Sequence, residues 1–74
     1  MEGIYFTRHA KARMRWRQIN KDEVIEVLRN PGQIEIIGEN RFYYFKQIGI
    51  RYLRVTCVIE FGRCVIVSVV DKSD

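Results

Sequence analysis

Three residues near the start of the chain have side chains that suit the handling of phosphate. His9, Arg13 and Arg17 are spaced four residues apart, so they lie on one side of a helix if this segment is helical. A guanidinium binds phosphate oxygens through two parallel hydrogen bonds, and an imidazole can gain or lose a proton near neutral pH. The spacing therefore predicts a surface on which one proton-transfer group lies beside two permanent cations.

The net positive charge of the chain is concentrated around these residues. The formal net charge is +4, and residues 1–19 account for all of it, because residues 20–74 carry eight cations and eight anions. Further candidates for binding a polyanion on the same segment are Arg8, Lys11, Arg15 and Trp16, whose indole could stack on a base or beneath an arginine. A localised basic face attracts polyanions, and nucleic acid is the usual one for a small protein. The alternative is a helix face that is charged only because it is solvated.

The chain is long enough for one small domain. With 74 residues it offers a single core, so we expect one domain over residues 1–74. Hydrophobic residues make up 47% of the sequence, which argues against a disordered chain. No apolar run approaches the about 18 residues of a membrane helix, and the start of the chain lacks the layout of a signal peptide. We therefore expect no membrane association and a cytoplasmic location.

Two helices are predicted ahead of a β-rich region. Thr7 is a good N-cap for a helix over about residues 8–17. Asn20 and Glu23 have the spacing of a capping box that begins a second helix. This helix should end at residues 30–32, Asn-Pro-Gly, because the residue before a proline resists helical geometry.

Four strands are predicted after the second helix. The segments rich in β-branched and aromatic residues are 33–37, 41–47, 51–60 and 64–70. The connections between them are short enough for hairpins only, so the strands should form an antiparallel meander. The expected fold is α+β, with two N-terminal helices packed on a four-stranded antiparallel sheet.

The third strand predicts which side of the sheet the helices cover. Its alternate apolar residues share one face that should pack against the helices, namely Leu53, Val55, Cys57, Ile59 and Phe61.

The two cysteines are expected to be free, buried thiols. A turn around Gly62 would pair Cys64 with a residue near Glu60, which leaves Cys57 about 10 Å away at about 3.4 Å per residue, beyond the reach of a disulfide. With a single histidine and no Cys-x-x-Cys pair, a zinc site has little support. We expect neither a metal nor a cofactor.

Spaced residues over nearly the whole chain carry a family resemblance. They are His9-Ala10, Arg13-Met14, Arg17, Ile19, Glu23-Val24, Asn30-Pro31, Tyr43-Tyr44, Lys46 and Leu53-Arg54-Val55. With them the chain resembles the small bacterial, archaeal and phage proteins grouped as domain-of-unknown-function family 4258. The resemblance implies a fold related to RelE-like and BrnT-like toxins, which are small ribonucleases with helices packed on an antiparallel sheet. One departure is Gln18, where the family often has a glycine that can end the first helix in left-handed geometry at little cost.

The resemblance also implies a reaction. A toxin ribonuclease of this kind activates the ribose 2′-hydroxyl against the adjacent phosphate, which requires a base, an acid and cations but no metal. In that case His9 would be the base or acid, Arg13 and Arg17 would hold the phosphate, and Arg54 or Tyr44 would contribute from the sheet. The implied function is a RelE-like, toxin-type, metal-independent endoribonuclease acting on RNA. Arg54 could instead be an ordinary cross-strand neighbour in the sheet.

Two other classes of function remain open. One is a non-catalytic nucleic-acid-binding module that uses the same basic helix, and the lack of a carboxylate with an evident acid role favours binding over cleavage. The other is an interaction protein whose basic helix docks an acidic partner, such as a small antitoxin protein. At the level of single residues, His9 could support packing, while Arg13 and Arg17 could form ion pairs with Glu23, Glu26 or the carboxylates of the sheet.

Overall fold

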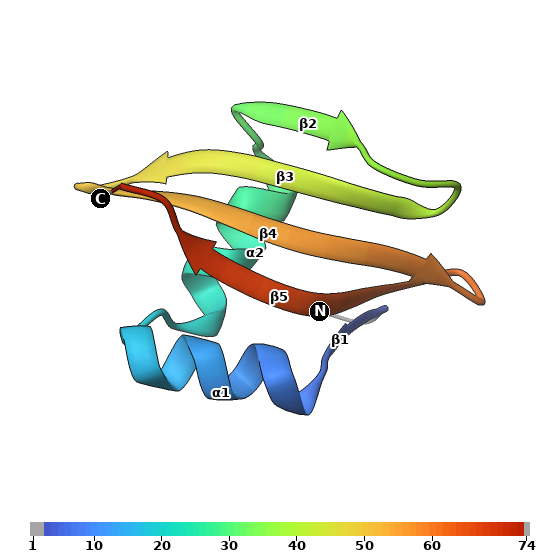
Figure 1. The fold of residues 1–74 in the computed structure, drawn as a ribbon, viewed down its shortest axis with the longest axis horizontal. Helices are drawn as coiled ribbons and strands as arrows, with labels where there is room; N and C mark the ends of the chain where they lie inside the picture. The colour runs from blue at the N-terminus through green and yellow to red at the C-terminus, as the bar shows by residue number, and fades with distance from the viewer. Residues whose placement is uncertain (1–2, 74) are drawn as a thin grey trace.

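The computed structural model of the protein describes residues 3–73. Along the chain, the elements of this part are β1 (Ile4–Phe6), α1 (Arg8–Arg17), α2 (Lys21–Arg29), β2 (Gln33–Ile36), β3 (Arg41–Ile48), β4 (Arg51–Glu60) and β5 (Arg63–Asp71). The α+β class and the two N-terminal helices are confirmed, and the four predicted strands are present (Figure 1). No helix of the described part is long and apolar enough to cross a membrane.

The sheet differs from the prediction at one edge. Its strand order is β1-β5-β4-β3-β2, and β2 to β5 form the predicted antiparallel meander. The prediction of four antiparallel strands is wrong because β1 adds a fifth strand, parallel to β5. The addition of β1 satisfies backbone groups at the edge of β5, and Thr7 then donates its N–H and its hydroxyl to the carbonyl of Ile66, at 3.0 and 3.1 Å. No local pattern in the sequence predicts this pairing, because the partners are 59 residues apart.

Local signals in the sequence account for the ends of the helices. The side chain of Thr7 accepts a hydrogen bond from the N–H of Ala10 at 3.1 Å, as an N-cap does. Asn20 and Glu23 form the predicted capping box, with reciprocal hydrogen bonds of 2.9 and 3.0 Å. Between the helices, Gln18 has φ 58° and ψ 46° and therefore ends α1 in the left-handed region.

Both helices pack on the same face of the sheet, α1 along β5 and α2 against β3 and β4 (Figure 1). The core consists of Phe6, Ala10, Met14, Ile19, Val24, Val27, Leu53, Val55, Cys57, Ile66 and Val69. The prediction that Leu53, Val55 and Cys57 face the helices is confirmed. Ile59 lies on the same face but is 39% exposed, and Phe61 in the turn is 96% exposed, so the prediction that these two side chains are buried is wrong. The end of β4 and the turn after it project beyond the two helices in Figure 1.

The opposite face of the sheet is covered by neither helix. The register between β3 and β4 pairs Phe45 with Arg54 and Tyr43 with Thr56, so these four side chains lie on the opposite face from the core residues Leu53 and Val55. We call this side of the sheet the helix-free face.

Candidate nucleic-acid interface

Helix α1 presents most of its charged side chains to solvent. Its buried residues are Ala10 and Met14, which form a narrow apolar stripe. Arg13 is half-buried. The exposed side chains are Arg8, His9, Lys11, Ala12, Arg15, Trp16 and Arg17. The helix is therefore held on β5 by few apolar groups, and the rest of its surface is basic.

The basic residues of α1 lie on two flanks of the apolar stripe. At 3.6 residues per turn, His9, Arg13 and Trp16 share one flank, which we call the Trp16 flank. The other flank carries Arg8, Lys11 and Arg15 and is called the Lys11 flank. No ion pair joins the Lys11 flank to an acidic residue within the part of the chain that the structure describes.

The only tryptophan of the chain lies between two guanidinium groups. The Cζ atoms of Arg13 and Arg17 are 6.0 and 5.3 Å from the centre of the Trp16 ring, within the range of a cation–π interaction. The indole is nevertheless 71% exposed. Nε of Arg13 is buried and has no hydrogen-bond partner among residues 3–73. The Trp16 flank thus combines an accessible ring with cations that can bind phosphate.

The carboxylates that could have neutralised α1 are paired with the sheet instead. Arg51 Nη2 lies 2.8 Å from a carboxylate oxygen of Glu23, and Arg51 Nη1 donates to the carbonyls of Arg17 and Gln18 at 3.0 and 3.3 Å. In the same way, Lys46 Nζ lies 4.0 Å from Glu26. Both carboxylates are therefore bound by cations of the sheet, and within residues 3–73 no ion pair joins Arg13 to Glu23 or Glu26. We did not predict the role of Arg51, because its partners are about 30 residues away in the sequence.

A further acidic group lies at the end of β5, near the end of α1. The hydroxyl and N–H of Ser73 both donate to Asp71 Oδ1, at 2.5 and 3.0 Å. These hydrogen bonds, together with the positive charges of Arg17 and Arg51, lower the pKa of Asp71 below its ordinary value. The charge of Arg17 is thus partly compensated by Asp71. The other basic residues of α1 lie nearer the start of the helix.

The two sheet residues proposed for catalysis lie on opposite faces. Tyr44 pairs with Val55 in the β3–β4 register and packs against the core. Arg54 lies on the helix-free face, with its Cζ 4.4 Å from the ring centre of Tyr43. The structure therefore does not bring Tyr44 and Arg54 together in one site.

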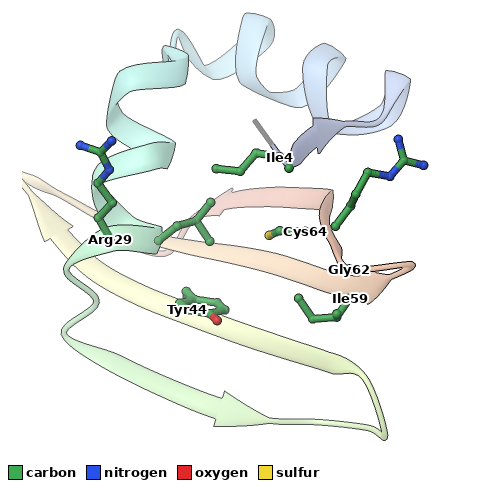
Figure 2. Close-up of a pocket in the computed structure, with 9 residues that line it drawn as sticks. Ile4, Arg29, Tyr44, Ile59, Gly62 and Cys64 are labelled. Atoms are coloured by element: carbon green, nitrogen blue, oxygen red, sulfur yellow. The ribbon is translucent and has the colours of Figure 1, made fainter. Parts of the chain in front are cut away.

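Tyr44 instead lines an apolar pocket of about 400 Å³ beside the core. Its walls come from β1, α2, β3 and the β4–β5 hairpin, with Ile4, Leu28, Ile59 and Cys64 as further lining residues. Arg29 also borders the pocket, but in Figure 2 its guanidinium points away from Tyr44 and Ile59. Burial, followed by the nearby thiols, raises the pKa of the Tyr44 hydroxyl. No residue of α1 lines this pocket.

The cysteines are free, but their separation differs from the prediction. Cys64 pairs with Ile59, the residue next to Glu60, which confirms the predicted pairing across the turn. Cys57 pairs with Ile66, which places both thiols on one face, two positions apart along the ladder. A hydrogen bond between them raises the pKa of Cys57 and lowers that of Cys64. Among residues 3–73, no cluster of three or more potential metal ligands is present.

Comparison with known proteins identifies a family but no activity. The family model described as Domain of unknown function (DUF4258) matches residues 6–71, which confirms the resemblance seen in the sequence. Searches of the curated proteins and of the solved structures find no significant match.

Proposed function

The chain belongs to the DUF4258 family, and because that description assigns no activity, we propose from the geometry that it binds RNA through the basic surface of α1. The observation that carries this proposal is the Lys11 flank, whose cations are exposed and not paired with acidic residues in the described part of the chain. Exposed, uncompensated cations on one helix are the electrostatic footprint of a protein that binds a polyanion.

The Trp16 flank favours a nucleic acid as the ligand over a simple anion. An exposed indole offers a stacking surface to a base, and the adjacent guanidinium groups offer donors to phosphate. An acidic protein, such as a small antitoxin, would also be attracted by the cations. An acidic protein would gain less affinity from the exposed Trp16 ring, because the ring stacks best on a nucleic-acid base.

The test is RNA affinity as a function of salt for two variants that lose the same charge. Lys11→Ala with Arg15→Ala removes one lysine and one arginine from the proposed surface, whereas Arg29→Ala with Lys72→Ala removes the same types elsewhere. Each lost phosphate contact on a single strand should lower the slope of log affinity against log salt by about 0.7. We therefore expect a slope reduced by about 1.4 in the first variant and a slope close to wild type in the second. Equal losses in both variants would contradict a defined interface on α1.

Metal-independent RNA cleavage is a second candidate, favoured by one observation. His9 is exposed and shares the Trp16 flank with Arg13, one helical turn further on, so a bound phosphate would lie within reach of an imidazole. This candidate is the RelE-like, toxin-type endoribonuclease. In the presence of a chelator, His9→Ala should then slow cleavage by about 10²- to 10⁴-fold while leaving RNA affinity unchanged. Undetectable cleavage by the wild-type protein would leave binding as the function.

A further inference from the structure

An aromatic ladder occupies the helix-free face. The ring centres of Tyr43 and Phe45 are 5.9 Å apart, in an edge-to-face arrangement. Phe45 and Tyr52 are also separated by 5.9 Å but are nearly parallel, with 18° between their planes. Arg54 completes the group, since its Cζ lies 4.4 Å from the ring centre of Tyr43. We refer to these four residues as the aromatic ladder.

The ladder is half-buried although no helix covers it. On a sheet with one solvated face, residues on that face are usually polar, and three adjacent rings depart from this rule. Tyr5 is a further aromatic residue on this side of the sheet: it pairs with Val65 in the β1–β5 register and is 55% exposed. The face therefore presents partly accessible aromatic side chains to a partner.

The charges on this face indicate what kind of partner it fits. Cations and anions are mixed on this side of the sheet, where the registers place Arg41, Arg54 and Arg63 together with Glu35 and Glu60. Charge alone would thus neither attract nor repel a ligand strongly here. Nε of Arg54 is buried, without a hydrogen-bond partner among residues 3–73. Stacking a second copy of the chain on this face would bury the Arg54 of both copies, which is unfavourable unless each guanidinium gains an anionic partner.

Unpaired bases fit these observations better. Each base has a π-face that stacks on an aromatic ring or on a guanidinium plane, and this stacking needs no net charge. We propose that the aromatic ladder stacks the unpaired bases of single-stranded RNA. The inference rests on the proposed function, since α1 would supply the attraction for the phosphates, and it defines the class of RNA as single-stranded.

The experiment compares a single-stranded RNA of about 12 nucleotides with the same sequence in a duplex. Tyr43→Leu, Phe45→Leu and Tyr52→Leu each remove a ring but retain an apolar side chain. Phe61→Leu is the control, because Phe61 is 96% exposed at a turn outside the ladder. Each ladder variant should lose about tenfold in affinity for the single strand. Affinity for the duplex and the salt slope should both stay at the wild-type values.

The outcomes separate this inference from the proposed function. If the ladder variants bind single strands as wild type does while the Lys11 and Arg15 substitutions reduce the salt slope, the ladder proposal is wrong and RNA binding by α1 stands. If the wild-type protein binds no RNA at low salt, both proposals fail. A dimer that forms with rising protein concentration and is lost in the ladder variants would instead identify a second copy as the occupant.

A second measurement needs no variant and therefore does not depend on variant folding. RNA that carries photoreactive 4-thiouridine is crosslinked to the wild-type protein, and the attached peptides are identified by mass spectrometry. Crosslinks within β3 and β4 are expected. Crosslinks confined to α1 would overturn the ladder proposal.

Discussion

Gln18 holds its backbone in a conformation that a glycine adopts at lower cost. Its φ of 58° lies in the left-handed region, where a side chain with a Cβ costs roughly 1–2 kcal/mol. The conformation is needed because it directs the chain from α1 into α2 and allows the N–H of Ile19 to donate to the carbonyl of Met14, at 2.8 Å. The cost is therefore a consequence of the short connection between the helices.

Gln18→Gly should stabilise the protein. The gain from removing the Cβ exceeds the loss from a more flexible unfolded chain, which leaves a net of about 1 kcal/mol. The free energy of unfolding, measured in urea, checks this value. Gln18→Ala is the matched control, because alanine keeps the Cβ and should give no gain. A stabilisation of the same size in the alanine variant would show that the backbone conformation is not the cause.

The contact between the two cysteines predicts how their alkylation depends on pH. The hydrogen bond from Cys57 lowers the pKa of Cys64, so Cys64 should be alkylated by iodoacetamide at a lower pH than an ordinary thiol. Cys57 is buried and its pKa is raised, so it should react only on unfolding. Mass spectrometry of the alkylated protein over a pH series distinguishes the two sites. Cys57→Ala removes the hydrogen bond and should move the Cys64 profile to higher pH. Equal modification of both cysteines in the folded protein would contradict the register.

Contacts between residues that are close in the sequence could be predicted, whereas contacts between distant residues could not. Thr7 and the Asn20–Glu23 pair act within one helical turn, so their spacing in the sequence contains the whole signal. The contact between Cys57 and Cys64 depends on whether Cys64 pairs with Ile59 or Glu60. A shift of one residue moves a side chain to the other face of a sheet, and the sequence around Gly62 did not distinguish the two registers.

Among the secondary-structure elements, the junction between α1 and α2 depends on a strand residue. Arg51, at the start of β4, binds the Glu23 carboxylate and the carbonyls at the end of α1. Cations stabilise the C-terminus of a helix, where carbonyls are unpaired. One arginine therefore fixes the end of α1 and the start of α2 to the sheet.

Arg51→Met should destabilise the protein by about 1–2 kcal/mol, since both charged side chains are still 23% exposed and water screens part of the interaction. For a chain of this length, that loss lowers the melting temperature by roughly 4–16 °C. Arg41→Met, an exposed arginine on the neighbouring strand, is the control and should change little. The same melting temperature for both variants would mean that Arg51 does not anchor the junction.

The elements themselves were predictable except at the edge of the sheet. The segments that became α1, α2 and β2 to β5 each have a periodicity or a cap within them. Ile4–Phe6 is too short for either, and its strand character depends on the unpaired edge of β5. The prediction of Ile59 and Phe61 as core residues was wrong because alternation in a strand does not show where the covering helices end.

For the molecule as a whole, the distribution of charge is the feature most relevant to function. The chain measures 33 × 24 × 19 Å, while charges in physiological salt are screened beyond about 8 Å. The balanced charges of residues 20–74 therefore do not cancel those on the far side of α1. An approaching polyanion would meet the field of α1 locally, whatever the rest of the molecule carries.

The candidate site was predictable from the sequence only on α1. Helical spacing indicated which side chains share a flank, and the structure leaves that helix exposed. Tyr44 and Arg54 were assigned from family resemblance, and alternation within β3 and β4 sends them to opposite faces. The aromatic ladder was not predicted, because it depends on which strands are neighbours and on which face the helices leave uncovered.

The most direct test of RNA binding by α1 uses Trp16, the single tryptophan of the chain, as a reporter on the surface itself. A single-stranded RNA is titrated into the protein at low salt while indole emission is recorded, with anisotropy of labelled RNA measured in parallel. If α1 is the interface, the emission should change along a saturable curve that gives the same affinity as anisotropy, and added salt should reverse it. RNA binding by anisotropy with no change in indole emission would contradict an interface on α1, and absence of binding at low salt would contradict RNA as the ligand.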